Sequence, residues 1–239
     1  MNTIKFNKNF TKIVAHRGLS GIEKENTNAA FVAAGNRSYY GIETDIHRTS
    51  DGRFVVCHDD DLKRVAGVDI AVESTTLAEL QSIVLFDKDG TKNREDLRVS
   101  VLENYLSICK KYEKHCVLEL KSDFTDEEIS QIIEIVKSFD YLENVTFISF
   151  IYSNMTKIRK LCPTQSVQFL FSKFDDEIIE RLIAARIDVD VYYKVLTKEM
   201  IDLLHENGLK VNCWTVDNPE SAEKLSAWGV DYITSNILE

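Results

Sequence analysis

Short apolar runs rich in β-branched residues alternate with helical patterns along most of this chain. Strands that alternate with helices are typical of a parallel sheet, because each connection between parallel strands has to cross back over the sheet. Eight runs have the length and composition of strands: Lys12–His16, Gly41–Asp45, Cys116–Leu120, Val145–Ser149, Ser166–Phe171, Ile187–Val191, Lys210–Trp214 and Asp231–Thr234. The pattern predicts an α/β protein with the fold of a TIM (β/α)₈ barrel.

Several of the connecting helices can be placed by their start signals. Thr125 and Glu128 have the spacing of a capping box, and apolar residues then recur on one helical face: Ile129, Ile132, Ile133 and Val136. The pairs Thr76/Glu79 and Ser100/Glu103 repeat the capping spacing. We expect the apolar face of the helix after Thr125 to lie on the barrel.

The connection between the second and third predicted strands is longer than an ordinary βα connection. Within residues 46–99, Arg53–His58 reads as an extra strand and Thr76–Ile83 as a short helix. The rest of the chain offers no Gly/Ser-rich linker and only two prolines among 239 residues. We therefore predict a single domain over residues 1–239, with a small subdomain inserted at about 46–99 over the mouth of the barrel.

The charge of the chain limits its partners. With 39 acidic and 29 basic residues the formal net charge is −10, whereas proteins that bind a phosphate backbone carry a surplus of Lys and Arg. Nucleic acid and anionic membrane surfaces are therefore disfavoured as partners, and any phosphate site must be local.

No apolar run approaches the roughly 20 residues of a transmembrane helix, and residues 1–10 lack the apolar centre of a signal peptide. We expect no transmembrane segment and a cytoplasmic location. The chain ends soon after the last predicted strand, which leaves one flank of the barrel to be covered by the N-terminal segment or by a second copy in a homo-oligomer.

Three acidic residues occupy the predicted second and third strands. Glu43 and Asp45 are two residues apart and so share a face, and Glu119 lies on the neighbouring strand. Each acid taken alone could pair with a nearby Lys or Arg. If all three converge at the carboxyl ends of the strands, like-charge repulsion requires a cation, and three carboxylates favour Mg²⁺, Ca²⁺ or Mn²⁺ over zinc.

Two histidines end predicted strands. His16 closes the first strand, before Arg17 and Gly18, and His58 closes the extra strand. Either one alone is more often structural than catalytic. Near a cation, however, the two could act as a general acid and base around neutral pH.

The order and spacing of the motifs resemble the glycerophosphodiester phosphodiesterase family from about residue 13 to residue 235. The motifs that carry the resemblance are His16-Arg17-Gly18, Glu25-Asn26-Thr27, Glu43-Thr44-Asp45, Thr49-Ser50-Asp51-Gly52, His58-Asp59, Glu119-Leu120-Lys121 and Cys213-Trp214-Thr215-Val216. The string as a whole is far more specific than any one of its members.

The resemblance implies a metal-dependent enzyme that hydrolyses small glycerophosphodiesters to glycerol 3-phosphate and an alcohol. It assigns Glu43, Asp45 and Glu119 as metal ligands, with Mg²⁺, Ca²⁺ or Mn²⁺ as the ion. It further assigns His16 and His58 as the acid/base pair, without saying which is the acid, Arg17 and Lys121 as phosphate contacts, and Trp214 as a pocket wall. In the family, one histidine helps the glycerol 2-hydroxyl attack phosphorus.

Two other functions stay open at this level. The same site could cut a lipid-bearing diester as a lysophospholipase D, or the barrel could bind phosphorylated ligands without turnover.

Some residues near the predicted site are ambiguous. Asp188 and Asp190 could extend the polar floor of the barrel or pair with Lys or Arg inside it, and Phe150 could line the pocket or simply pack. We expect His47 to be exposed, and we expect His115 and His205 to lie in or near helices, without a role.

Overall fold

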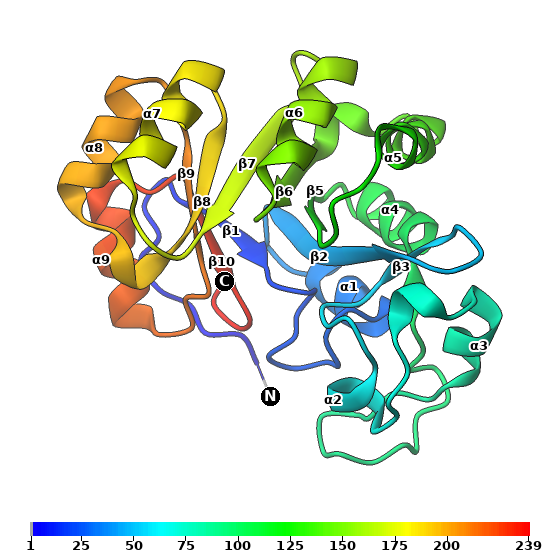
Figure 1. The fold of residues 1–239 in the computed structure, drawn as a ribbon. Helices are drawn as coiled ribbons and strands as arrows, with labels where there is room; N and C mark the ends of the chain where they lie inside the picture. The colour runs from blue at the N-terminus through cyan, green and yellow to red at the C-terminus, as the bar shows by residue number, and fades with distance from the viewer. Residues whose placement is uncertain (1) are drawn as a thin grey trace.

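The structure is a computed structural model that describes residues 2–239. Within this range ten strands form one sheet, and eight of them are parallel and close into a barrel because β1 pairs with both β10 and β2 (Figure 1). The barrel strands are β1 (Lys12–Ala15), β2 (Gly41–Arg48), β5 (His115–Leu120), β6 (Val145–Ser149), β7 (Ser166–Phe171), β8 (Asp188–Tyr192), β9 (Val211–Trp214) and β10 (Tyr232–Ser235). The predicted TIM barrel is confirmed.

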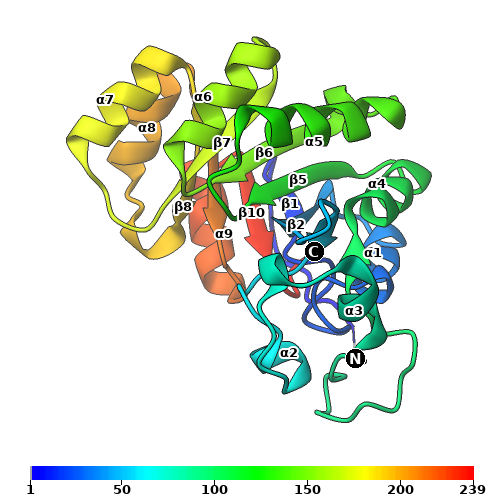
Figure 2. The same ribbon diagram turned by 45° about the vertical axis from the view of Figure 1, so that its right-hand side comes forward.

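The helices lie on the outside of the strands, as Figures 1 and 2 show. They are α1 (Asn28–Gly35), α4 (Leu102–Lys111), α5 (Asp126–Ser138), α6 (Tyr152–Leu161), α7 (Asp176–Ala185), α8 (Lys198–Glu206) and α9 (Pro219–Trp228), with the 3₁₀ turns η2 (Leu142–Asn144) and η3 (Tyr193–Val195). Thr125 and Glu128 form the predicted capping box of α5. The pair Ser100/Glu103 does not cap α4, because Ser100 belongs to the strand β4 (Ser100–Val101) and α4 begins at Leu102.

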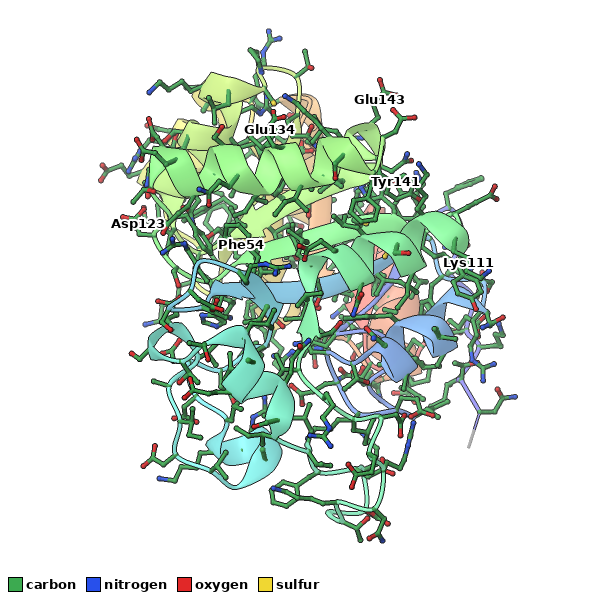
Figure 3. The ribbon with its side chains drawn as sticks, turned by 90° about the vertical axis from the view of Figure 1, so that its right-hand side faces the viewer. Phe54, Lys111, Asp123, Glu134, Tyr141 and Glu143 are labelled. Atoms are coloured by element: carbon green, nitrogen blue, oxygen red, sulfur yellow. The ribbon has the colours of Figure 1, made fainter. Side chains whose placement is uncertain are left out.

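The main core lies between the strands and the helices. The apolar face of α5 is buried there, as its pattern predicts. Figure 3 shows the contrast: Glu134 and Glu143 point away from the molecule, whereas Phe54 and Tyr141 lie between packed elements. A smaller apolar cluster of Val14, Val117, Ile148 and Leu170 lies inside the barrel.

Residues 49–101 leave the barrel between β2 and β5. β3 (Phe54–Val56) pairs antiparallel with β2, β4 pairs antiparallel with β3, and α2 (Lys63–Ala66), η1 (Val72–Ser74) and α3 (Leu77–Ser82) follow at one side of the barrel (Figure 2). This segment has its own apolar cluster, which includes Val55, Leu62, Leu80 and Leu97. Its designation as an inserted subdomain stays a prediction.

The N-terminal segment runs beside the end of the chain. Ile4 forms a parallel bridge with Leu238, and Phe6 packs against the main core. The Glu239 carboxylate accepts hydrogen bonds from Thr3 Oγ1 at 2.6 Å and from Ser38 N and Oγ at 2.7 Å. Glu239 therefore joins this segment to the loop before β2.

No helix in the described part of the chain combines the length and the apolar character needed to cross a membrane.

The Glu239 contacts predict a pH-dependent contribution to stability. Burial by itself raises the pKa of Glu239, but the hydrogen bonds from Thr3 and Ser38 lower it, from an ordinary value of 4.5 to about 2. Since the folded chain favours the carboxylate, the contribution is complete above pH 4.5 and is lost as the pH falls towards 2. We expect Glu239→Gln to lower the free energy of unfolding above pH 4.5, and the difference from wild type to shrink towards pH 2.

Denaturant unfolding at a series of pH values measures this difference. Glu143→Gln, at an exposed position of η2, is the matched control and should leave the curve unchanged. A constant difference between wild type and Glu239→Gln across the acid range would contradict the assignment.

Candidate active site

A cavity opens at the carboxyl ends of the barrel strands. Ionisable side chains line one part of it: His16, Arg17, Glu43, His58 and Glu119. Ile148, Phe150, Leu170 and Trp214 form an apolar wall, and Asp190, Thr215 and Thr234 complete the lining. This is the end at which TIM barrels carry their active sites.

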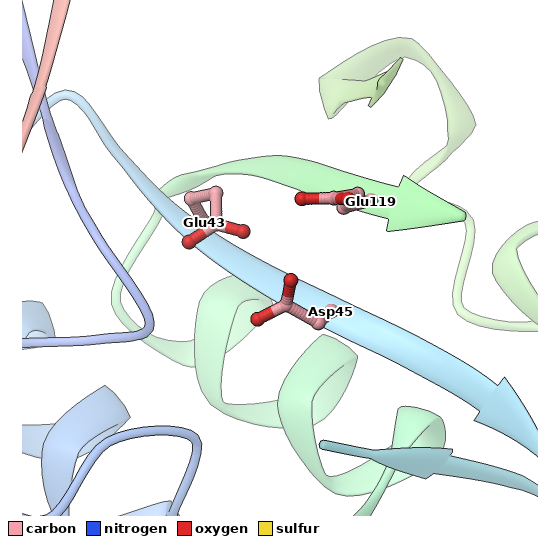
Figure 4. Close-up of side chains that lie close together, drawn as sticks. All are labelled: Glu43, Asp45 and Glu119. Carbon is pink, nitrogen blue, oxygen red and sulfur yellow. The ribbon is translucent and has the colours of Figure 1, made fainter. Parts of the chain in front are cut away.

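Three buried carboxylates meet beside this cavity. Glu43 and Asp45 lie on the same face of β2, and the strand register places Asp45 directly opposite Glu119 of β5. One oxygen from each of the three lies within 4.8 Å of the others (Figure 4). The structure thus brings together the three acids that the sequence singled out.

The basic side chains of the protein offset the charges of these acids only in part, because Lys121 and Arg17 lower the pKa of Asp45 despite its burial but leave those of Glu43 and Glu119 raised. Burial raises the pKa of Glu43, and the charges of Asp45 and Glu119 raise it further. Burial and Asp45 raise the pKa of Glu119 to about 7. The raised pKa values show that Glu43 and Glu119 are unfavourable sites for negative charge. They indicate that the cluster lacks positive charge to stabilise its carboxylates.

Two of the three acids have a basic side chain beside them, as the salt-bridge alternative requires. Lys121 Nζ lies 2.9 Å from Glu119 Oε1 and 3.6 Å from Asp45 Oδ1, and Arg17 Nε lies 3.6 Å from Asp45 Oδ2. Within residues 2–239, however, nothing donates a hydrogen bond to Asp45 Oδ1, although this oxygen is buried. An unpartnered buried oxygen amid three hard ligands fits a divalent cation.

The loop after β1 is shaped to reach this cluster. Arg17 adopts a φ of +54° and Gly18 a φ of +75°, and a Cβ at Gly18 would lie 2.7 Å from backbone and side-chain atoms of Ala30. This tight turn directs the Arg17 backbone N–H to Glu43 Oε2 at 2.7 Å. Glycine is therefore required at residue 18 for Arg17 to take its place.

His16 and His58 line the same cavity but have different partners. His16 Nδ1 lies 2.8 Å from Asn236 Oδ1, and His58 Nδ1 lies 2.8 Å from Asp59 Oδ1. Burial lowers the pKa of His16 to about 4 and also lowers that of His58. With Nδ1 engaged in both rings, Nε2 is the nitrogen left for a ligand.

A chain of ion pairs connects His58 to Arg17. Asp59, the partner of His58, accepts a hydrogen bond from Arg64 Nε at 2.7 Å, and Arg64 binds Glu25 through both terminal nitrogens at 2.7 and 2.8 Å. Glu25 also accepts from Arg17 Nη1 at 2.9 Å. Although burial raises the pKa of Glu25, the hydrogen bonds from Arg64 and the charge of Arg17 lower it to about 2, so Glu25 is a carboxylate.

The remaining predicted residues also lie at the site. Lys121 contacts the acids as described, and Trp214 packs against Phe150 and Tyr192 at ring distances of 5.7 and 5.5 Å. Phe150 lines the cavity, which resolves that ambiguity.

Two histidines outside the predicted site differ from our expectations. His47 is buried, not exposed, because β2 continues to Arg48 through its pairing with β3 and turns His47 to the Glu43 face. Its Nδ1 lies 3.1 Å from Glu73. His115 opens a strand and its Nε2 contacts Thr146 Oγ1 at 2.8 Å.

Two residues that hydrogen-bond to the predicted site residues were not identified from the sequence. Asn26 donates to Asp45 Oδ2 at 2.8 Å and accepts from Thr44 Oγ1 at 2.8 Å, while Asn236 holds His16. Asn26 belongs to one of the quoted motifs, which is the only signal that could have indicated it. Asn236 carries no such signal.

The model of the glycerophosphoryl diester phosphodiesterase family matches residues 16–238. The chain belongs to this family. It is 28% identical over 234 residues to the glycerophosphodiester phosphodiesterase of Caldanaerobacter subterraneus subsp. tengcongensis, covering 95% of this chain and 94% of that relative.

Solved structures of similar proteins agree with this placement. A phosphodiesterase of Oleispira antarctica, in complex with the product sn-glycerol-3-phosphate, matches with a TM-score of 0.88 and 25% identity over 98% of this chain and 96% of the other. A glycerophosphodiester phosphodiesterase from Parabacteroides distasonis matches with a TM-score of 0.79 and 28% identity, covering 95% and 93%. The predicted family and enzyme class, a phosphoric diester hydrolase, are confirmed.

The acid cluster predicts a test of cation binding. We expect Glu119→Gln, which removes a charge and keeps the shape, to weaken the binding of Mg²⁺, Ca²⁺ or Mn²⁺ by about 10-fold or more. Calorimetric titration of chelator-treated protein measures this affinity. Glu134→Gln, exposed on α5, serves as the control. Unchanged affinity in Glu119→Gln would remove Glu119 from the ligand set.

Proposed function

We propose that this chain hydrolyses small glycerophosphodiesters to glycerol 3-phosphate and an alcohol, with a divalent cation held by Glu43, Asp45 and Glu119. The observation that carries the proposal is the cluster of three buried carboxylates, with its unpartnered Asp45 oxygen, beside two histidines that line the same cavity. Family membership and the product-bound structure of a similar phosphodiesterase support it.

The proposed roles follow the charge distribution of phosphoryl transfer. The non-bridging oxygens of the phosphate keep negative charge throughout, and a bound divalent cation supplies the charge that stabilises them. In this proposal Arg17 and Lys121, which flank the acids, contact the same oxygens, and the planar guanidinium can do so through two donors.

Proton transfer falls to His16 and His58. Their engaged Nδ1 atoms fix the orientation of each ring and leave Nε2 towards the ligand, which is the arrangement that a general acid and base require. One histidine assists the attacking glycerol 2-hydroxyl and the other protonates the departing alcohol. Trp214, with Phe150, forms the apolar wall against which the substrate lies.

The proposal is tested by the release of glycerol 3-phosphate. Chelator-treated protein is supplied with Mg²⁺, Ca²⁺ or Mn²⁺ and offered a panel of glycerophosphodiesters, with glycerophosphocholine as the reference. We expect turnover that depends on the added cation. Equal turnover without any cation would contradict the role of the acids, and phosphate-ester binding without turnover would indicate a non-catalytic barrel.

Lysophosphatidylcholine in the same assay separates this function from a lysophospholipase D activity. We expect glycerophosphocholine to be the better substrate. A clear preference for the lipid would overturn the proposed substrate class.

If His16 and His58 transfer protons, replacing either one should lower turnover without weakening cation binding. We expect His16→Ala and His58→Ala each to lower the turnover number by about 10²-fold or more, because each removes a proton-transfer group. Cation affinity, measured by calorimetry, should stay close to wild type. His205→Ala, in which the histidine belongs to helix α8, is the control and should keep wild-type rates. A variant of His16 or His58 with wild-type turnover would lose its proposed acid/base role.

A further inference from the structure

Asp190 is a buried acid that the proposed mechanism does not use. It lies on β8, its side chain is 2% exposed, and it lines the active-site cavity together with its strand neighbour Leu170. Its Oδ1 is fully buried and has no hydrogen-bond donor anywhere in residues 2–239. An unpartnered buried carboxyl is costly, and native proteins rarely keep one without a reason.

The polar residues near Asp190 are engaged with one another. Asn212, its neighbour on β9, donates to Gln168 Oε1 at 3.2 Å and accepts from Thr234 Oγ1 at 3.3 Å. Trp214 Nε1 lies 3.3 Å from the Asp190 backbone carbonyl, not from its side chain. The cavity is therefore the place from which a partner for this carboxyl can come.

Asp188, on the same strand and face, shows the ordinary alternative. Its Oδ1 accepts a hydrogen bond from the Lys210 backbone N–H at 2.9 Å, and it does not line the cavity. The two acids are thus distinguished by their partners, and Asp188 provides a matched control.

The surroundings of Asp190 favour a neutral carboxyl group. Burial raises its pKa well above the ordinary range, and the charge of Glu119 raises it further. A neutral carboxyl both donates and accepts a hydrogen bond, which matches a hydroxyl group better than a phosphate or a cation.

We propose that Asp190 binds the terminal hydroxyl of the glycerol part of the substrate and selects for it. The inference rests on the proposed function. The phosphate belongs beside Arg17, Lys121 and the acid cluster, and the 2-hydroxyl belongs beside the histidines, which leaves the terminal hydroxyl without a partner. Asp190 is deeply buried, whereas Phe150, which is 46% exposed, marks the mouth of the cavity. The deep end, where Asp190 lies, therefore suits the glycerol part.

Product binding tests this inference without requiring turnover. Glycerol 3-phosphate is compared, by calorimetric titration, with propane-1,2-diol 1-phosphate, which keeps the 2-hydroxyl and lacks the terminal one. We expect the wild-type protein to bind glycerol 3-phosphate about 10- to 100-fold more tightly, since the analogue leaves the buried carboxyl unpaired.

Two variants of Asp190 make the test specific. Asp190→Leu should bind both compounds within about 3-fold of each other, and its melting temperature should rise because an unpaired buried polar group has been removed. Asp190→Asn keeps a donor and an acceptor and should retain most of the preference. Asp188→Asn should behave as wild type. A preference that survives in Asp190→Leu, or one that wild type lacks, would overturn the inference.

The phosphocholine diesters of glycerol and of propane-1,2-diol separate this inference from the proposed function. Hydrolysis of both diesters at equal rates by wild type would refute the role of Asp190 and leave the function standing. Binding that discriminates between the two phosphates, without hydrolysis of either diester, would do the reverse.

Discussion

The convergence of three carboxylates in a buried site is the constraint on which the rest of this molecule depends. The register between β2 and β5 places Asp45 opposite Glu119, and barrel closure prevents either strand from sliding away. Like charges at this distance in a poorly solvated site repel strongly. The backbone turn at Arg17 and Gly18, the Lys121 ammonium and the Asn26 amide each contact one of these carboxylates.

The architecture was readable from the sequence because it follows from periodic patterns. β6 and β7 begin and end at the predicted residues, and the capping box and buried face of α5 lie where the spacing of Thr125 and its apolar successors puts them. These features depend on residues close together in the chain. The three acids could be grouped for a related reason, since strand alternation and adjacent strands fix their common direction.

What the sequence could not supply were contacts between distant segments. His16 meets Asn236 across 220 positions, and no local pattern relates the two. His47 was misplaced because only the pairing of β2 with β3 shows that the strand continues past Asp45. Ser100 has the spacing of a helix cap, but it pairs with β3 and therefore belongs to a strand. Asp190 could be placed on its face of the sheet, whereas its lack of a partner depends on the whole barrel interior.

The ion pairs of Glu25 unite two parts of the site that come from different parts of the fold. This one carboxylate binds Arg17 of the β1 loop and Arg64 of α2, and Arg64 in turn holds the acid that orients His58. Arg17 and His58 therefore share a common anchor. In related chains, residue 25 and the segment around residue 64 should change together in evolution. If residues 49–101 were replaced by a segment from another protein, the barrel would accept it only if the new segment brought a guanidinium to the same place.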